Sequence, residues 1–104
     1  MVYIELLRRG YKTGDTLFYY HTKNDREIDF VLRESNRITQ LIQVAYELST
    51  PKSRERELRA LEEAARELNC ENLLLITWAN EEIAAYKEVR IRITSVREWF
   101  LSGS

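Results

Sequence analysis

Two polar residues in the middle of the chain are best placed to do chemistry, Asp29 and Gln43. The alternation of a strand over residues 27–32 predicts one face with Glu27, Asp29 and Val31 and another with Ile28, Phe30 and Leu32. The same period over residues 41–46 groups Gln43 with Leu41 and Ala45. Antiparallel pairing of these segments across the connection at 33–37 brings Asp29 and Gln43 to a common face. We expect a functional site there.

The elements that position this pair follow from the patterning of the chain. Residues 16–48 read as three successive strands, at 16–22, 27–32 and 38–46. A helix is expected before them, at 2–9, and Gly10 ends it. After them Thr50 and Pro51 begin a helix that runs from about 52 to 68.

The remainder predicts a buried strand at 72–78, parallel to the third strand, and a strand at 89–93 with one wet face at a sheet edge. Residues 79–85 form a less regular segment, read as a helical turn, and Ser95 opens a last short helix. The expected fold class is α/β, with a mixed central sheet flanked by helices and the order α-β-β-β-α-β-β-α. We expect a single domain at 1–101, followed by a cut linker or appended tail at 102–104.

Composition excludes several classes of protein. Of 104 residues, 44% are hydrophobic and 32% charged, as in a soluble globular domain. The net charge of -1 creates no global attraction to nucleic acid. Cys70 is the single cysteine, so neither an internal disulfide nor a zinc-site spacing is possible, and a reducing, cytoplasmic setting is expected. No signal peptide or membrane-spanning run is recognisable, and no membrane partner is expected.

Several other side chains have both a functional and a structural interpretation. His21 can act as a base beside Glu27 or Asp29, but no Ser or Cys accompanies it, and an exposed strand histidine is favoured. Cys70 follows a helix C-terminus, which disfavours a thiolate, so it is expected to be a small buried residue.

The aromatic side chains Tyr19, Tyr20, Tyr46, Trp78 and Trp99 could stack bases, but core positions are favoured. Arg54, Arg56 and Arg59 could line a track for nucleic-acid phosphates. Glutamates alternate with them, and this favours a solvated helix face laced with weak ion pairs. No glycine-rich phosphate loop is present, so the chain has no ATPase motif of its own.

The element order, together with the runs at 27–32 and 41–46, resembles the PD-(D/E)xK nuclease fold, also called restriction-endonuclease-like. The longer string through residues 3–10, 18–20, 27–31, 41–44 and 73–78 resembles the C-terminal nuclease-like domain of archaeal AAA-type ATPases. The resemblance implies that Asp29 is the metal-binding Asp and that Glu5 is the helix-borne Glu. Gln43 stands where the second acid belongs, and Ala45 where the Lys belongs. A divalent metal, Mg²⁺ or Mn²⁺, would then be held by Asp29, Gln43 and Glu5.

Because two of the motif positions depart from the pattern, the leading hypothesis is a catalytically degenerate, nuclease-like accessory domain. It would bind nucleic acid or the ATPase domain of a larger archaeal protein, with Asp29 hydrogen-bonded to a backbone amide or to Gln43. One alternative is an excised scaffold with an engineered or residual metal site near Asp29, a transition metal if engineered, as suggested by Ala45, Ala79, Ala84 and Ala85. Another is a weak Mg²⁺- or Mn²⁺-dependent DNA nuclease.

Overall fold

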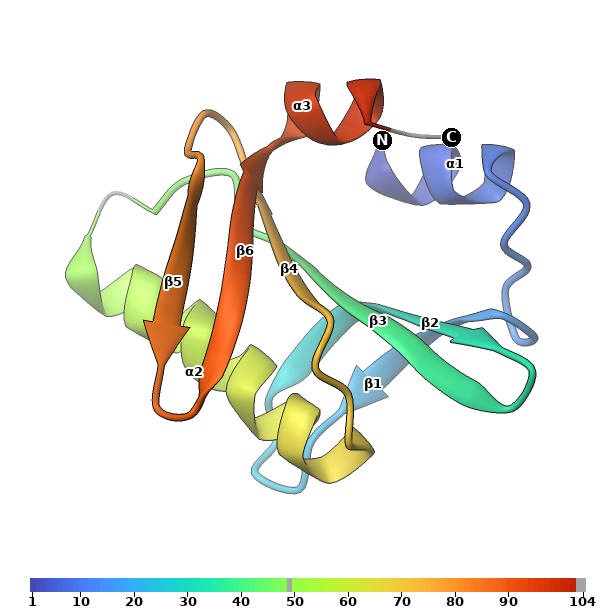
Figure 1. The fold of residues 1–104 in the computed structure, drawn as a ribbon, viewed down its shortest axis with the longest axis horizontal. Helices are drawn as coiled ribbons and strands as arrows, with labels where there is room; N and C mark the ends of the chain where they lie inside the picture. Colours follow the sequence, from blue (N-terminus) through green and yellow to red (C-terminus); the bar gives the residue numbers. More distant parts are fainter. Residues whose placement is uncertain (49, 103–104) are drawn as a thin grey trace.

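A computed structural model describes residues 1–48 and 50–102 (Figure 1). Its elements, in chain order, are α1 (Val2–Arg8), β1 (Leu17–His21), β2 (Glu27–Glu34), β3 (Arg37–Val44), α2 (Pro51–Leu68), β4 (Leu73–Thr77), β5 (Glu82–Tyr86), β6 (Val89–Ser95) and α3 (Val96–Leu101). None of the helices in the described part combines the length and apolar character needed to cross a membrane.

The six strands form one mixed sheet in the order β1-β2-β3-β4-β6-β5. Strands β1 to β3 pair antiparallel, β4 lies parallel to both β3 and β6, and β5 closes the far edge antiparallel to β6. Helix α2 covers one face, and α1 and α3 lie on the other (Figure 1). The predicted α/β class, with a mixed sheet flanked by helices, is confirmed.

Helix α2 begins and ends where its sequence signals place it. The Thr50 hydroxyl accepts the Ser53 backbone N–H at 3.0 Å, and Pro51 occupies the first turn, where it has no hydrogen bond to lose. The helix ends at Asn69, whose φ of 53° is left-handed. The chain then enters β4, all five residues of which are buried, as predicted for an inner strand.

Two hydrophobic clusters lie on opposite sides of the sheet. The cluster under α2 contains Ile28, Val31, Leu41, Leu61, Leu75, Ile91 and Ile93. The cluster under α1 and α3 contains Val2, Leu6, Leu32, Ile42, Leu74, Ile76 and Trp99, with Phe30 and Val44 packed against it. Residues of β2, β3 and β4 contribute to both clusters, so the centre of the sheet is covered on both faces.

Two predictions for the C-terminal third are wrong. Residues 82–85, which belong to the segment expected to form a helical turn, lie in strand β5, so three strands and not two separate α2 from α3. Consequently β6 is not an edge strand, because every residue of β5 pairs with it. The alternation of β6 correctly predicts one solvent-exposed face, since Ile91 and Ile93 are buried while Arg90 and Arg92 are exposed. Alternation reports which faces are buried, but it does not report which edge is paired.

Candidate functional site

Asp29 lies in a bulge of β2. Phe18 pairs with Val31 and Tyr20 with Ile28, so the single residue Tyr19 on β1 lies opposite two residues on β2, Asp29 and Phe30. An extra residue of this kind bends the strand and breaks its strict alternation. Ile28 and Val31 accordingly both pack under α2, although the sequence pattern predicts different faces for them.

Gln43 closes the gap that the bulge leaves between β2 and β3. Backbone pairing of these strands extends only as far as Phe30 and Ile42. Beyond that point the Gln43 Oε1 accepts the backbone N–H of Asp29, and its Nε2 donates to the backbone carbonyl of Glu27, both at 2.9 Å. Nε2 also donates to the Glu57 carboxylate on α2, at 3.0 Å. The side chain is 6% exposed, and its hydrogen-bonding groups are satisfied within the fold.

Asp29 and Gln43 do not share a face. The Gln43 amide reaches Glu57 on the α2 side. The Asp29 carboxylate borders two shallow hollows on the α1 side, together with Tyr3 and Phe30. The prediction of a common face is therefore wrong, and the physical reason is the bulge. It directs Asp29 and its neighbour Phe30 to the same side, which strict alternation forbids.

Among the described residues, a single group donates a hydrogen bond to the Asp29 carboxylate. Its Oδ2 accepts the backbone N–H of Val44 at 2.9 Å, so Asp29 replaces a carbonyl of the sheet ladder. Burial raises the pKa of Asp29, the Val44 N–H opposes that shift, and the charge of Glu27 adds to it. The expected hydrogen bond of this carboxylate to a backbone amide is thus present.

Glu5 is occupied elsewhere. Its carboxylate forms ion pairs with Arg8 at 3.2 Å and with Arg9 at 3.0 Å. The Arg9 guanidinium also donates to the Trp99 carbonyl and lies 4.2 Å from the centroid of the Trp99 ring. Among the described residues, no group of three or more His, Cys, Asp or Glu side chains is arranged to hold a metal ion. Metal binding by Asp29, Gln43 and Glu5 stays a prediction.

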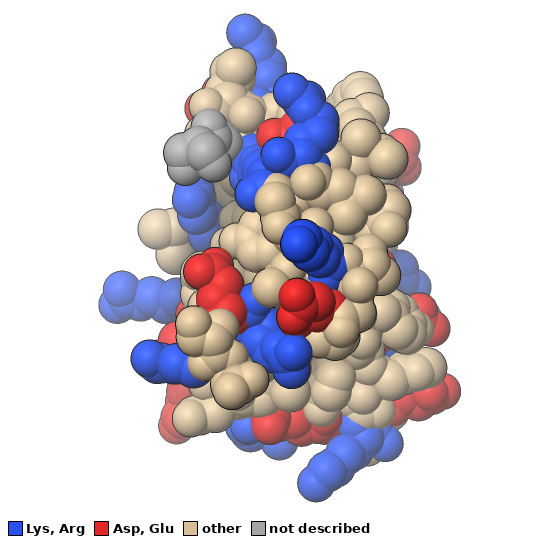
Figure 2. Space-filling model, turned by 90° about the vertical axis from the view of Figure 1, so that its right-hand side faces the viewer, with Lys and Arg blue, Asp and Glu red and all other residues tan. Residues whose placement is uncertain are grey.

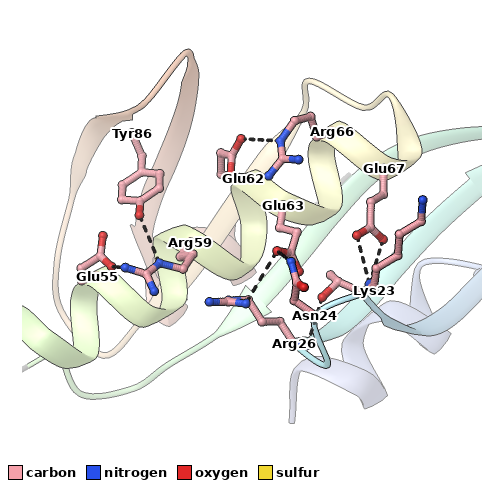
Figure 3. Close-up of polar contacts among 11 residues, drawn as sticks. Lys23, Asn24, Arg26, Glu55, Arg59, Glu62, Glu63, Arg66, Glu67 and Tyr86 are labelled. Atoms are coloured by element: carbon pink, nitrogen blue, oxygen red, sulfur yellow. Dashed lines mark hydrogen bonds and ion pairs between the residues drawn. The ribbon is translucent and has the colours of Figure 1, made fainter.

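The arginines of α2 are largely engaged in ion pairs. Arg54 binds the Glu82 carboxylate with both Nη atoms, at 3.1 and 2.7 Å, and ties α2 to the edge strand β5. Arg59 pairs with Glu55 and also donates to the Tyr86 hydroxyl at 3.4 Å (Figure 3). Arg56, whose side chain is 73% exposed, lies 3.8 Å from Glu57. The expected ion pairs are present, and contact of these arginines with phosphates stays a prediction.

Two glutamates of α2 make contacts that the sequence pattern did not reveal. Glu63 accepts the Asn24 side-chain amide at 2.6 Å, and Glu67 accepts the Lys23 backbone N–H at 3.0 Å (Figure 3). Glu67 also accepts the Tyr20 hydroxyl at 2.6 Å. These contacts hold the β1–β2 turn against the helix. The prediction that the whole charged face is solvated is wrong here, because Glu62 and Glu63 are buried. The four-residue spacing of Glu63 and Glu67 along one helix face was the available signal.

His21 and Cys70 lie where the structural interpretation of each predicts, at the surface and in the core respectively. The His21 Nε2 lies 3.0 Å from a carboxylate oxygen of Asp25, and half of its side chain is exposed. Cys70 is buried after the end of α2, and burial raises the pKa of its thiol. Neither residue belongs to a nucleophile–base arrangement within the described part of the chain.

Three of the aromatic side chains are not in the core. Trp99 is buried as expected, and Tyr20 packs partly against the α2 cluster. Tyr19 is 56% exposed and Trp78 is 65% exposed, and Tyr46 packs edge-on against Trp78 with ring centroids 5.8 Å apart. Of these, Tyr19 and Tyr46 border the hollows beside Asp29, so aromatic residues at strand ends were an available signal for a surface site there. The prediction of core positions, which rests on the strand and helix segments that contain these residues, is therefore wrong for Tyr19, Tyr46 and Trp78.

Charges of both signs share the surface. On the side turned to the viewer in Figure 2, Lys and Arg side chains are numerous, but Asp and Glu side chains lie between them. This agrees with the near balance of 16 basic and 17 acidic residues in the chain. No continuous basic track is visible on this side.

Comparison with known proteins identifies relatives of the chain but no chemistry. The model of a family described as "Domain of unknown function (DUF4143)" matches residues 1–98. An uncharacterised protein of Methanocaldococcus jannaschii, MJ1544, is 37% identical over an alignment of 108 positions, and this alignment covers 98% of the chain. The chain spans 24% of that relative's length. No solved structure matches the chain significantly.

Proposed function

Because the chain belongs to the DUF4143 family, we propose that it is a non-catalytic, nuclease-like accessory domain that works within a larger ATPase polypeptide. Its element order supports the kinship. Helix α1, a three-stranded meander, helix α2 and a strand parallel to β3 follow one another, as the PD-(D/E)xK resemblance requires. The matched relative is about four times as long as the shared region, which supports a role as one part of a larger protein.

The bonding of Gln43 is the observation that carries the non-catalytic part of this proposal. A nuclease would need a free carboxylate at this position to hold a metal ion. Here a neutral amide is consumed by contacts with Asp29, Glu27 and Glu57. Two residues further on, Ala45 offers no donor for a phosphodiester. Gln43 instead joins β3 to β2 and α2, and Ala45, just after β3, packs against the cluster under α2.

Calorimetric titration with Mg²⁺ and Mn²⁺, together with cleavage assays on single- and double-stranded DNA, tests the absence of catalysis. The wild type and Asp29→Asn are expected to give equal heats and no cleavage. Asn keeps an acceptor for the Val44 N–H, so the comparison does not depend on unfolding. Heat that disappears in Asp29→Asn would establish a residual metal site, and Mn²⁺-dependent cleavage that disappears with it would establish a nuclease. Either result overturns the proposal.

The outer side of α1 is the surface proposed to contact the rest of the polypeptide. Val2 and Leu6 face the core, whereas Ile4 is 57% exposed and Leu7 is also exposed. Exposed apolar residues clustered on one helix face are typical of an interface. The proposed occupant is the ATPase part, because most of the relative's length lies outside the matched region.

Sedimentation of the chain mixed with the part of the M. jannaschii relative outside the match tests this contact. A complex is expected with the wild type and with the relative's own matching domain, and its loss is expected in Ile4→Asp. Ile83→Asp is a matched control, since Ile83 is a 72% exposed residue of the edge strand β5, away from α1 (Figure 1). Absence of a complex with the wild type, or equal binding by Ile4→Asp, overturns the assignment of this surface.

A further inference from the structure

Aromatic side chains, together with aliphatic ones, line the two hollows beside Asp29. One, of about 300 Å³, is bordered by Tyr3, Tyr19 and Phe30. The other, of about 260 Å³, is bordered by Tyr3, Phe30 and Tyr46. Asp29 borders both. We refer to Tyr3, Tyr19, Asp29, Phe30 and Tyr46 together as the Asp29 groove.

The walls of the groove are held in place by the fold. The Tyr3 and Phe30 rings are stacked, with centroids 6.4 Å apart and an interplanar angle of 12°. The Tyr3 hydroxyl is hydrogen-bonded to the Thr13 hydroxyl at 2.9 Å, which fixes the ring from the other end. Phe30 is anchored against the α1–α3 cluster. A ligand would therefore meet a preformed surface, which reduces the entropic cost of binding.

Within residues 1–48 and 50–102, the carboxylate of the groove has no cationic partner. Among the described residues, no Lys, Arg or His nitrogen lies within 4.0 Å of Asp29, and only its Oδ2 receives a hydrogen bond. Oδ1 is thus available to a donor from outside. The nearby charge of Glu27 is also negative, and it disfavours the ionised carboxylate. A bound cation would offset both the burial of Asp29 and this repulsion.

The chain contains the completed form of such an arrangement at another place. Arg9 stacks 4.2 Å from the Trp99 ring centroid, while its Nε binds the Glu5 carboxylate at 3.0 Å. A guanidinium combines stacking on an aromatic face with hydrogen bonding to a carboxylate, which an ammonium does less well. The Asp29 groove has the rings and the carboxylate of this arrangement without the arginine.

We propose that the Asp29 groove binds an arginine side chain of a partner protein, with the guanidinium paired to Asp29 and lying against the Tyr3, Phe30 and Tyr19 rings. This deepens the proposed function, since it names a group that the accessory domain recognises, and it rests on Asp29 holding no metal. Neither the ATPase part nor the exposed side chains of Ile4 and Leu7 are needed for the binding itself, since neither residue lines the groove.

An NMR titration of the 104-residue chain with the peptide acetyl-Gly-Arg-Gly-amide tests the proposal. Saturable shifts in the millimolar range are expected at the amides of Phe30 and Val44 and at the rings of Tyr3 and Tyr19. The same peptide with citrulline in place of arginine removes the charge and keeps the shape, and it is expected to give no saturable shift. Absence of saturation with the arginine peptide, or equal shifts with citrulline, overturns the proposal.

Two variants and a charge-matched control locate the binding. Asp29→Asn is expected to weaken it by about threefold to fivefold, and Tyr19→Leu by about twofold, as for a partly exposed ion pair and cation–π contact. Glu88→Gln removes one negative charge at the β5–β6 turn and is expected to leave the affinity unchanged. Equal affinities of Asp29→Asn and Glu88→Gln would contradict the assignment. Because these titrations contain no metal, their failure is separable from a positive Mn²⁺ titration, which would overturn the proposed function instead.

Discussion

The Gln43 side chain takes the place of a peptide group beside Asp29. Its Oε1 accepts the Asp29 backbone N–H at 2.9 Å, as a carbonyl would in a sheet, and its Nε2 donates to Glu27 as a backbone N–H would. The Asp29 carboxylate does the same for the Val44 N–H on the other side of the bulge. The two side chains thus supply the hydrogen bonds between β2 and β3 at the point where the two backbones no longer pair directly.

Replacing Gln43 with Glu, which would restore the acidic residue of a nuclease motif, is expected to destabilise the fold. The substitution removes both N–H donors and places a carboxylate where Nε2 now lies 3.0 Å from the Glu57 carboxylate. We expect a loss of about 2–4 kcal/mol in the free energy of unfolding, from unsatisfied buried groups and like-charge repulsion. Urea unfolding at neutral pH measures it.

The double variant Gln43→Glu/Glu57→Gln is the control. It relieves the repulsion and returns a donor to the pair, so it is expected to recover part of the lost stability. An unchanged urea midpoint in the single variant would mean that Gln43 is not the structural bridge described above.

Much of this fold could be predicted from the sequence because its signals are local. The Thr50 cap, the Pro51 start and the apolar stripe of α2 depend on neighbours a few residues away, and they gave the helix within one residue of its observed bounds. The apolar run of β4 likewise predicted an inner strand.

The site was harder to predict because its geometry depends on pairing between strands. The bulge arises from the pairing register of β1 with β2, and no residue type in 27–32 predicts it. One extra residue moved Asp29 away from the face of Gln43. For the same reason β5 was missed, since its pairing with β6 and the Arg54–Glu82 contact stabilise a short strand with little pattern of its own.

Asp29→Asn is expected to gain stability relative to the wild type as the pH rises. An unfolded Asp has a pKa of about 3.9, and burial raises the pKa of Asp29 in the folded chain. The stabilising contribution of its protonated form is therefore fully present below about pH 3.9 and is lost as the pH rises through the folded pKa. Asn has no such loss. Urea midpoints of both proteins between about pH 3 and pH 6 measure the trend, and parallel curves would contradict a raised pKa.

Glu63→Gln is expected to show the opposite dependence on pH. The pKa of Glu63 is lowered, chiefly by the hydrogen bond from the Asn24 amide, then by Thr22. Its contribution to stability is fully present above the unfolded value of about 4.3 and is lost as the pH falls through the folded pKa. The variant should be about 1 kcal/mol less stable than the wild type at neutral pH, the difference between a charged and a neutral acceptor.

That difference should shrink on acidification. Arg26 lies 3.6 Å from the Glu63 carboxylate and favours its ionised form as well. Unfolding of the two proteins across the acid range, with Asn24→Ala as a second way to remove the main hydrogen bond, checks the sign. A gap that widens below about pH 4 would contradict it.

Asn36→Gly is expected to stabilise the β2–β3 hairpin. Glu34 pairs with Arg37, which leaves Ser35 and Asn36 as a two-residue loop. Both have positive φ angles, 51° and 66°, a combination that the right-handed twist of a hairpin favours and that costs glycine least. We expect a gain of about 0.5 kcal/mol from relief of this strain, measured as an increased urea midpoint. Ser35→Val is the control in the other direction. A β-branched residue is strained at positive φ and should lower the midpoint, so equal midpoints for the two variants would contradict the left-handed conformation of this turn.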